Sequence, residues 1–202
     1  MSPNTSSQNS VRLAVIVGST RKDRIAPVVS DWFTARARER ADFDVDVIDL
    51  ADADLPHILE SPDENGVHPS QAVRDFAQRV DRADVFAVIT PEYNRGYPAS
   101  LKQAIDSVYT EFHAKPVGFI SYSGGATGGV RAVEQLRTVF AELHTVTLRD
   151  GVILPSVYEA FDEEGQPRDA EAVNGAAKQL LDQMLWWADA MRAARAKSPY
   201  TA

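Results

Sequence analysis

The sequence predicts an α/β fold in which helices cover both faces of a parallel sheet. Along the 202 residues, apolar segments rich in β-branched side chains alternate with segments whose apolar residues recur at helical spacing. The first apolar segment, VRLAVIV, lacks the polar alternation of a strand with one exposed face, which indicates burial between two helix layers. Strands that alternate with helices in this way are typical of a three-layer sandwich.

Five segments have the character of strands. The expected strands are residues 11–17, 45–50, 84–89, 116–122 and 146–154, the last of them weakened at residues 149–151. A loop without clear periodicity, residues 51–69, follows the second strand, and a hydrophilic insert, residues 159–168, follows the fifth.

Five segments have the spacing of amphipathic helices. The first helix begins near Ile25 and Pro27, and Asp169 is a candidate N-cap for a long last helix. The expected apolar faces include Val28, Val29 and Trp32; Val73, Phe76, Ala77 and Val80; Leu101, Ile105 and Val108; Val133, Leu136, Phe140 and Leu143; and Val173, Ala177, Leu180, Met184, Trp187 and Met191.

Among doubly wound sheets, the flavodoxin-like strand order 2-1-3-4-5 fits a chain with five strands. This order places the loops after the first, third and fourth strands around one mouth. Ligands of such sheets bind beyond the carboxyl ends of the strands. We therefore expect a binding site where these three loops meet.

Length and composition limit the classes of function. A chain of 202 residues with 44% hydrophobic content suits one core, so we expect one domain over residues 11–195, with a disordered polar leader at residues 1–10 and a tail at residues 196–202. The formal net charge of -8 disfavours a nucleic-acid binder. Neither a signal peptide nor a membrane helix of ~20 apolar residues is present, so we expect a cytoplasmic protein that does not bind membranes.

Cysteine and histidine offer little chemistry here. The absence of cysteine excludes disulfides, thiolate nucleophiles and cysteine metal ligands, and it fits a reducing compartment. The four histidines show no i, i+3 or i, i+4 spacing, so we expect no metal site.

Residues 18–24 connect a buried strand to a helix N-terminus, where backbone N–H groups and the helix dipole attract anions. Ser19 and Thr20 supply hydroxyl groups, and Arg21 and Arg24 supply forked donors that match phosphate oxygens. The segment matches neither a Walker loop nor a G-x-G-x-x-G fingerprint. It predicts a site for a phosphate monoester, with a solvated surface turn as the alternative.

Residues 90–106 (TPEYNRGYPASLKQAID) form the second candidate loop and lead into a helix. Backbone donors and flat side chains beyond a buried strand favour a planar ligand, and we interpret the loop as the floor of a flavin site. The alternative is an ordinary connection marked by proline, asparagine and glycine. Glu92 is a candidate general base, but we favour a role as acceptor for loop N–H groups. Lys102 and Asp106 have the spacing of a local ion pair.

Residues 121–129 (SYSGGATGG) form the third candidate loop. They resemble a degraded nucleophile elbow, G-x-S-x-G, but Ser121 replaces its first glycine and the nearest downstream histidine is His144. A hydrolase triad is therefore not expected. Glycines instead allow backbone N–H groups to approach the carbonyl groups of a flat heterocycle.

With these three loops, the chain resembles the NADPH-dependent FMN reductase family of flavodoxin-like proteins, which includes quinone, azo-dye and chromate reductases. The resemblance extends from about Leu13 to Pro155. It depends on G-S-x-R after the first strand, on P-E-Y-N with L-K-x-x-I-D after the third, and on the Ser/Gly-rich loop that leads to R-A-x-E-Q-L-R at residues 131–137. The third loop is one residue longer than the usual S-Y-G-G pattern, and Gln103 replaces a common asparagine.

The resemblance implies FMN as the cofactor. In such proteins the first loop holds the FMN phosphate, the P-E-Y-N loop lies against the isoalloxazine, and the third loop meets its pyrimidine edge. The residues implied are Ser19, Arg21, Arg24 and Ile25; Pro91, Glu92, Tyr93, Asn94 and Arg95; and Ser123, Gly124 and Gly125. No catalytic side chain and no metal are implied, because the flavin N5 carries the chemistry.

The resemblance further implies an oxidoreductase in which NAD(P)H passes a hydride to FMN, and a small acceptor (free flavin, quinone, azo dye or metal oxyanion) is then reduced. Lys22, Arg95 and Arg131 are candidates for binding the extra phosphate of NADPH, and a homodimer or homotetramer is implied. One alternative is a flavodoxin-type electron carrier without nicotinamide turnover; the acidic charge favours it, whereas Arg21 and Arg24 do not. A non-catalytic FMN sensor is a third hypothesis.

Overall fold

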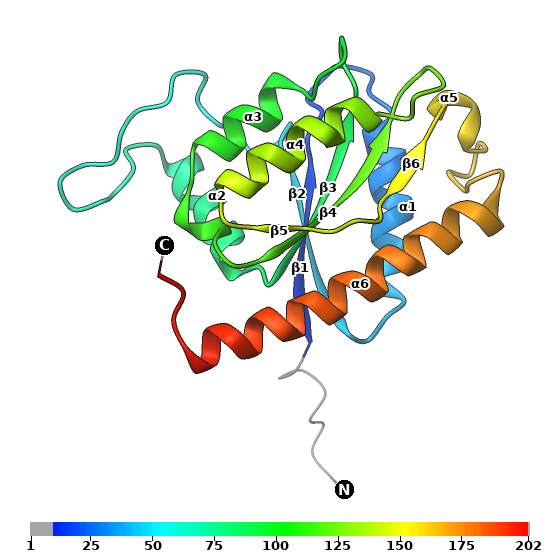
Figure 1. Ribbon diagram of the computed structural model, residues 1–202. Coiled ribbons are helices and arrows are strands. Elements are labelled where there is room, and N and C mark those ends of the chain that lie inside the picture. The colour runs from blue at the N-terminus through cyan, green and yellow to red at the C-terminus, as the bar shows by residue number, and fades with distance from the viewer. Residues whose placement is uncertain (1–9, 202) are drawn as a thin grey trace, which may run out of the picture.

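The computed structural model describes residues 10–201, which form a parallel sheet between two helix layers (Figure 1). Residues 1–9 of the predicted leader lie outside the described residues. The strands are β1 (Val11–Val17), β2 (Phe43–Asp49), β3 (Val85–Pro91), β4 (Pro116–Tyr122), β5 (Val146–Thr147) and β6 (Val152–Leu154). The sheet order is β2-β1-β3-β4-β5, with β6 also paired to β4. The flavodoxin-like α/β fold and the order 2-1-3-4-5 are confirmed.

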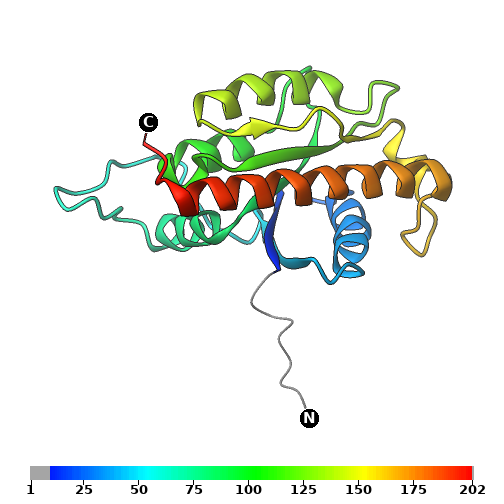
Figure 2. The same ribbon diagram turned by 60° about the horizontal axis from the view of Figure 1, so that its bottom comes forward.

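The helices separate into two layers, each with its own apolar core. Helices α1 (Ala26–Arg38) and α6 (Ala170–Lys197) cover one face, and Figure 2 shows α6 lying along that face. Helices α2 (Gln71–Arg82), α3 (Ala99–Asp106) and α4 (Val130–Glu142) cover the other face. Strands β3 and β4 are therefore buried along their whole length, which explains their continuous apolar sequence.

The predicted fifth strand is divided into β5 and β6 by the segment that the sequence marked as weak. The Arg137 guanidinium of α4 donates hydrogen bonds to the carbonyl oxygens of Leu148 (2.7 Å) and Arg149 (2.9 Å). At Gly151, a Cβ atom would lie 2.7 Å from the carbonyl oxygen of Phe119. The Arg137 side chain therefore binds two carbonyl groups that, in a continuous strand, would accept hydrogen bonds from the neighbouring strand. Only glycine fits at position 151, because the backbone there packs directly against Phe119.

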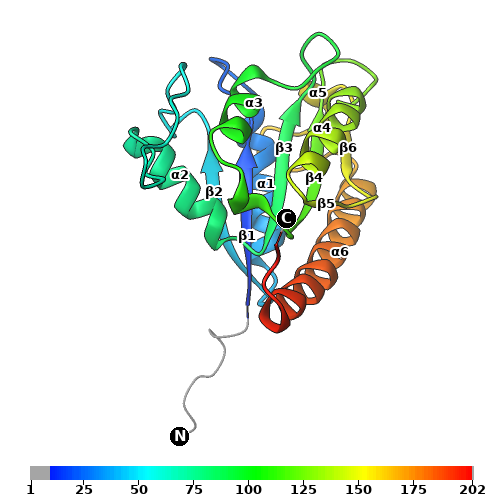
Figure 3. The same ribbon diagram turned by 60° about the vertical axis from the view of Figure 1, so that its left-hand side comes forward.

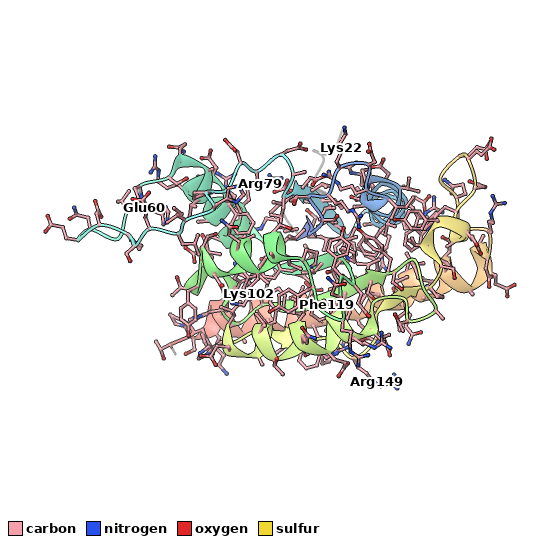
Figure 4. All side chains as sticks on the ribbon, turned by 90° about the horizontal axis from the view of Figure 1, so that it is seen from above. Lys22, Glu60, Arg79, Lys102, Phe119 and Arg149 are labelled. Carbon is pink, nitrogen blue, oxygen red and sulfur yellow. The ribbon has the colours of Figure 1, made fainter. Side chains whose placement is uncertain are left out.

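Several local elements differ from the sequence prediction or refine it. A short helix, α5 (Val157–Ala160), begins just before the hydrophilic insert, and a 3₁₀ turn, η1 (Thr110–Phe112), precedes β4. The aperiodic loop between β2 and α2 projects from the body, as the position of Glu60 shows in Figure 4. The predicted cap of α6 is confirmed, because the Asp169 carboxylate accepts from the Ala172 N–H at 3.2 Å.

Asp84 connects three elements at the amino edge of the sheet, opposite the candidate loops. Its carboxylate accepts two hydrogen bonds from the Arg12 guanidinium, at 3.0 and 3.1 Å, and Arg195 of α6 lies 3.5 Å away. The Asp84 side chain is only 3% exposed. Burial acts to raise the pKa of Asp84, but the hydrogen bonds from Arg12 outweigh it, so the pKa lies below its ordinary value.

We predict that Asp84→Asn lowers the free energy of unfolding by about 2 kcal/mol, because it leaves Arg12 and Arg195 without their buried counter-charge. The pKa of Asp84 in the folded protein lies below its unfolded value of about 3.9. The stabilisation that the Asp84 carboxylate gives to the fold is therefore fully present above about pH 4. It is lost as the pH falls through the native pKa. Urea unfolding of both proteins should give a constant difference from pH 8 to 5 that shrinks below about pH 4. A difference that grows on acidification would contradict this account.

Candidate functional site

The loops after β1, β3 and β4 meet at the carboxyl edge of the sheet, at the top of Figure 3. They enclose a cavity of about 340 Å³, a volume within the range of small-molecule sites. Its lining is Arg21, Lys22, Asp23, Arg24, Ile25, Pro91, Glu92, Tyr93, Tyr122, Ser123, Gly124, Val157 and Tyr158. All three predicted loops therefore contribute to one site.

The β1 end of this cavity has the properties of an anion site. Helix α1 begins there without a side-chain cap and without an acidic residue in its first turn. Among the described residues, the backbone N–H groups of Thr20 and Arg21 have no protein acceptor. Unpaired N–H groups and an uncompensated helix dipole both favour a bound anion.

The side chains of the first loop are held in place by neighbours across the site. Ser19 is buried, and its hydroxyl shares a hydrogen bond of 2.9 Å with the Tyr93 hydroxyl. The Arg21 guanidinium lies over the Tyr93 ring, 5.8 Å from its centre. Arg24 is oriented by Asp49 at 2.5 Å, while its Nε is buried and has no partner among the described residues. Both arginines thus keep donors available for an anion at the start of α1.

The β4 end of the cavity offers donors without negative charge. The hydroxyl of Tyr122, the last residue of β4, is buried without a partner in the described part of the chain. Burial, with a smaller effect of nearby Tyr93, raises the pKa of Tyr122, so its phenol stays protonated. The N–H groups of Gly124 and Gly125 also have no acceptor among the described residues. Such an edge suits the carbonyl and ring nitrogen acceptors of a heterocycle.

The loop after β3 contains a tight turn that borders a second cavity. Tyr93 and Gly96 exchange two backbone hydrogen bonds, of 2.8 and 3.0 Å, and between them Asn94 and Arg95 have positive φ values of 50° and 70°. The adjoining cavity, of about 550 Å³, is lined by Thr20, Arg21, Glu92, Tyr93, Asn94, Pro98, Ala99 and Ser100. The two cavities share Arg21, Glu92 and Tyr93, so they adjoin at these three side chains.

The predicted site residues are brought together with few exceptions. Ser19 lies beneath the cavities, Asn94 lines the second, and Arg95 and Gly125 line neither. Those that line the first cavity are Arg21, Arg24, Ile25, Pro91, Glu92, Tyr93, Ser123 and Gly124. Sequence reasoning missed Tyr122, Val157 and Tyr158. Tyr122 could have been found from the sequence, because it stands at the carboxyl end of a buried strand, where ligands bind. Val157 and Tyr158 belong to the short helix α5, which the sequence did not indicate.

Charged candidates near the site separate into paired and exposed groups. The carboxylate of Glu92 is a structural acceptor, but its donors are the backbone N–H and guanidinium of Arg131 in α4 and not the loop N–H groups that the sequence suggested. Arg131, a candidate for the NADPH phosphate, is therefore paired with Glu92. Lys102 and Asp106 form the predicted local pair, at 2.6 Å. Lys22 is exposed and points away from the protein body in Figure 4.

Other cavities and clusters lack this combination of features. A larger cavity, of about 970 Å³, lies between the loop after β2 and the ends of α3 and α4, away from the loops after β1 and β4. The His113 and His144 rings are 4.7 Å apart although they lie far apart in the sequence. No group of three or more ligating side chains that could hold a metal ion occurs among the described residues.

Comparison with known proteins identifies the chain. The model of the family described as "NADPH-dependent FMN reductase" matches residues 11–159, which is most of the chain and includes all three loops. The chain belongs to this family. It is therefore an oxidoreductase with FMN as cofactor and NAD(P)H as electron donor.

Relatives of this FMN reductase support the assignment. It is 31% identical over 153 residues to an NAD(P)H-dependent FMN reductase of Schizosaccharomyces pombe (71% of this chain, 74% of the relative). It is 34% identical over 158 residues to a 2-hydroxy-1,4-benzoquinone reductase of a Burkholderia species (76% and 80%). The solved structure of FerB, an NAD(P)H:acceptor oxidoreductase of Paracoccus denitrificans, is 26% identical, with a TM-score of 0.73 over 90% of this chain and 98% of that one.

The first cavity fits FMN on the evidence of its polar groups. FMN carries a phosphate dianion at one end and a planar ring with carbonyl acceptors at the other. The first loop supplies an uncapped helix start with Arg21 and Arg24, and the third loop supplies Tyr122 and glycine N–H groups. The lining therefore offers donors that suit a phosphate at one end and donors that suit ring acceptors at the other. Within residues 10–201, no helix is both long and apolar enough to cross a membrane.

We predict that Tyr122→Phe weakens FMN binding about fivefold without lowering the stability of the apoprotein, because its hydroxyl has no hydrogen-bond partner among residues 10–201 to lose. Fluorescence titration of FMN and thermal unfolding of the apoprotein check the two parts. Tyr200→Phe is a matched control, since it removes a tyrosine hydroxyl bonded to His144 at 2.8 Å, far from the site. Unchanged FMN affinity in Tyr122→Phe would contradict the interpretation of the first cavity as the FMN site.

Proposed function

We propose that FMN binds in the first cavity with its phosphate at the start of α1 and its ring between the second and third loops. The observation that carries the proposal is the set of donors at both ends of the cavity that have no partner in the described part of the chain. Ser19, Arg21, Arg24 and Ile25 hold the phosphate. Pro91 to Arg95 support the ring, and Ser123, Gly124 and Gly125 meet its edge.

The protein's own contribution to the reaction is binding, orientation and electrostatics. Bound FMN supplies the ring that accepts a hydride and passes electrons on. Arg21, whose guanidinium lies over the Tyr93 ring, supplies positive charge near the start of α1, and Tyr122 keeps a proton at its hydroxyl to donate toward ring acceptors. N–H groups of the third loop stabilise negative charge that develops on the ring. No side chain is required as acid or base.

We propose that the second cavity receives the nicotinamide and then the acceptor, because it adjoins the first at Tyr93 and Arg21. Lys22, which lines the first cavity, and Arg95, which follows Asn94 of the second, are both exposed and are candidates for the extra phosphate of NADPH. Relatives include a benzoquinone reductase and an NADPH azoreductase of a Bacillus strain. We accordingly propose quinones and azo dyes as acceptors, ahead of free flavin and metal oxyanions.

We further propose that residues 11–195 act as one FMN-binding domain in a cytoplasmic homodimer or homotetramer. Exposed aromatic side chains support assembly: Tyr158 beside the FMN cavity is 70% exposed, and Trp186 on α6 is 64% exposed. Large exposed aromatic residues are typical of protein interfaces. Light scattering of the purified protein tests the oligomeric state.

The test of the proposed site compares FMN with riboflavin, which lacks the phosphate. We predict that Arg21→Gln and Arg24→Gln each weaken FMN binding about tenfold and leave riboflavin binding nearly unchanged, because each removes a charge-assisted bond to phosphate. The rate of NADPH oxidation with a quinone acceptor, followed at 340 nm at subsaturating FMN, should fall in both variants together with their FMN affinity. Arg149→Gln, whose side chain is 90% exposed, is the matched control. Equal losses for both flavins would contradict the placement of the phosphate.

A further inference from the structure

We propose that Arg131 and Gln135 of α4 are positioning residues that hold the turn at Tyr93–Gly96 in the shape that contacts the flavin ring. The inference rests on the proposed function, because it takes the second loop as the support of the ring. Neither side chain lines either cavity, so both act through the loop.

The turn is intrinsically unfavourable for its sequence. Asn94 and Arg95 both adopt positive φ, at 50° and 70°, as the two central residues of a tight two-residue turn must. Asparagine tolerates this region, but arginine has no side-chain interaction that favours it. The backbone at Arg95 therefore needs support from outside the turn.

Gln135 gives that support directly. Its Nε2 donates a hydrogen bond of 2.7 Å to the carbonyl oxygen of Arg95, within the turn. The Gln135 Oε1 atom packs against Gly96. A Cβ atom at Gly96 would lie only 3.3 Å from this oxygen, so glycine leaves room for the amide. The Gln135 amide thus lies against two consecutive residues of the turn.

Arg131 fixes the start of the same loop. Its guanidinium donates to Glu92 Oε1 at 2.9 Å, and its backbone N–H is 3.2 Å from Glu92 Oε2. The Glu92 side chain is only 7% exposed, whereas Arg131 is 40% exposed. Helix α4 has Gly129 as its N-cap and no side-chain cap of its own, so the Glu92 carboxylate takes that place. The ion pair and the cap together join the end of β3 to α4.

The two contacts act on one side of the loop. Arg131 and Gln135 are one helical turn apart, on the same face of α4. They contact Glu92 and Arg95, which flank Tyr93 and Asn94, and these two residues line the cavities. Helix α4 therefore serves as a rigid frame for the segment that the flavin ring contacts, and ring position depends on both side chains.

The experiment uses Arg131→Met and Gln135→Leu, which keep the apolar stem of each side chain and remove its polar end. We expect each to weaken FMN and riboflavin binding by the same factor, about tenfold for Arg131→Met and about fivefold for Gln135→Leu, because ring support and not phosphate binding is lost. The midpoint potential of the bound FMN should also shift. Arg131→Lys, which retains the charge, should restore part of the affinity.

Arg137→Met is the matched control, since it removes an arginine of the same helix whose hydrogen bonds go to residues 148 and 149 and not to the loop. It should lower thermal stability without changing either flavin affinity or the potential. Failure of the wild type to bind FMN would contradict the proposed function itself. If the wild type binds FMN and Arg131→Met and Gln135→Leu keep its affinity and potential, the positioning role is wrong and the proposed function stands.

Discussion

Parallel pairing of β1, β3 and β4 is the constraint on which the candidate site depends. Because neighbouring strands run in the same direction, their carboxyl ends meet at one edge, and loops far apart in the sequence are brought together there. Both faces of the sheet are covered by helices, so this edge is where the strands can present backbone groups to a ligand. The amino edge is instead closed by Asp84 and its arginines.

At the carboxyl edge, the protein leaves polar groups unsatisfied. Buried polar groups normally find partners, and those without one deserve an explanation. Among the described residues, the Tyr122 hydroxyl, Arg24 Nε and the N–H groups of Arg21 and Gly124 have no partner, and all four residues line the first cavity. FMN, the cofactor of the family, carries an anionic phosphate and a polar ring, and donors of this kind match both groups.

Most of the fold could be predicted from local sequence, because buried strands and amphipathic helices leave strong periodic signals. The division of the fifth strand could not, since it follows from the hydrogen bonds of Arg137 to Leu148 and Arg149 and from the packing of Gly151 on Phe119. The loops of the site were predicted from their position after strands. The pairing of Glu92 with Arg131 was not, because 39 residues separate them and only the fold brings them together.

A single structure can test whether the three loops hold one FMN molecule. A crystal structure of the protein with FMN should place the phosphate within hydrogen-bond distance of Arg21 and Arg24 at the start of α1. The ring should lie between Tyr93 and the N–H groups of Gly124 and Gly125. FMN bound with its phosphate at the third loop, or in the larger cavity beside α3, would contradict the account.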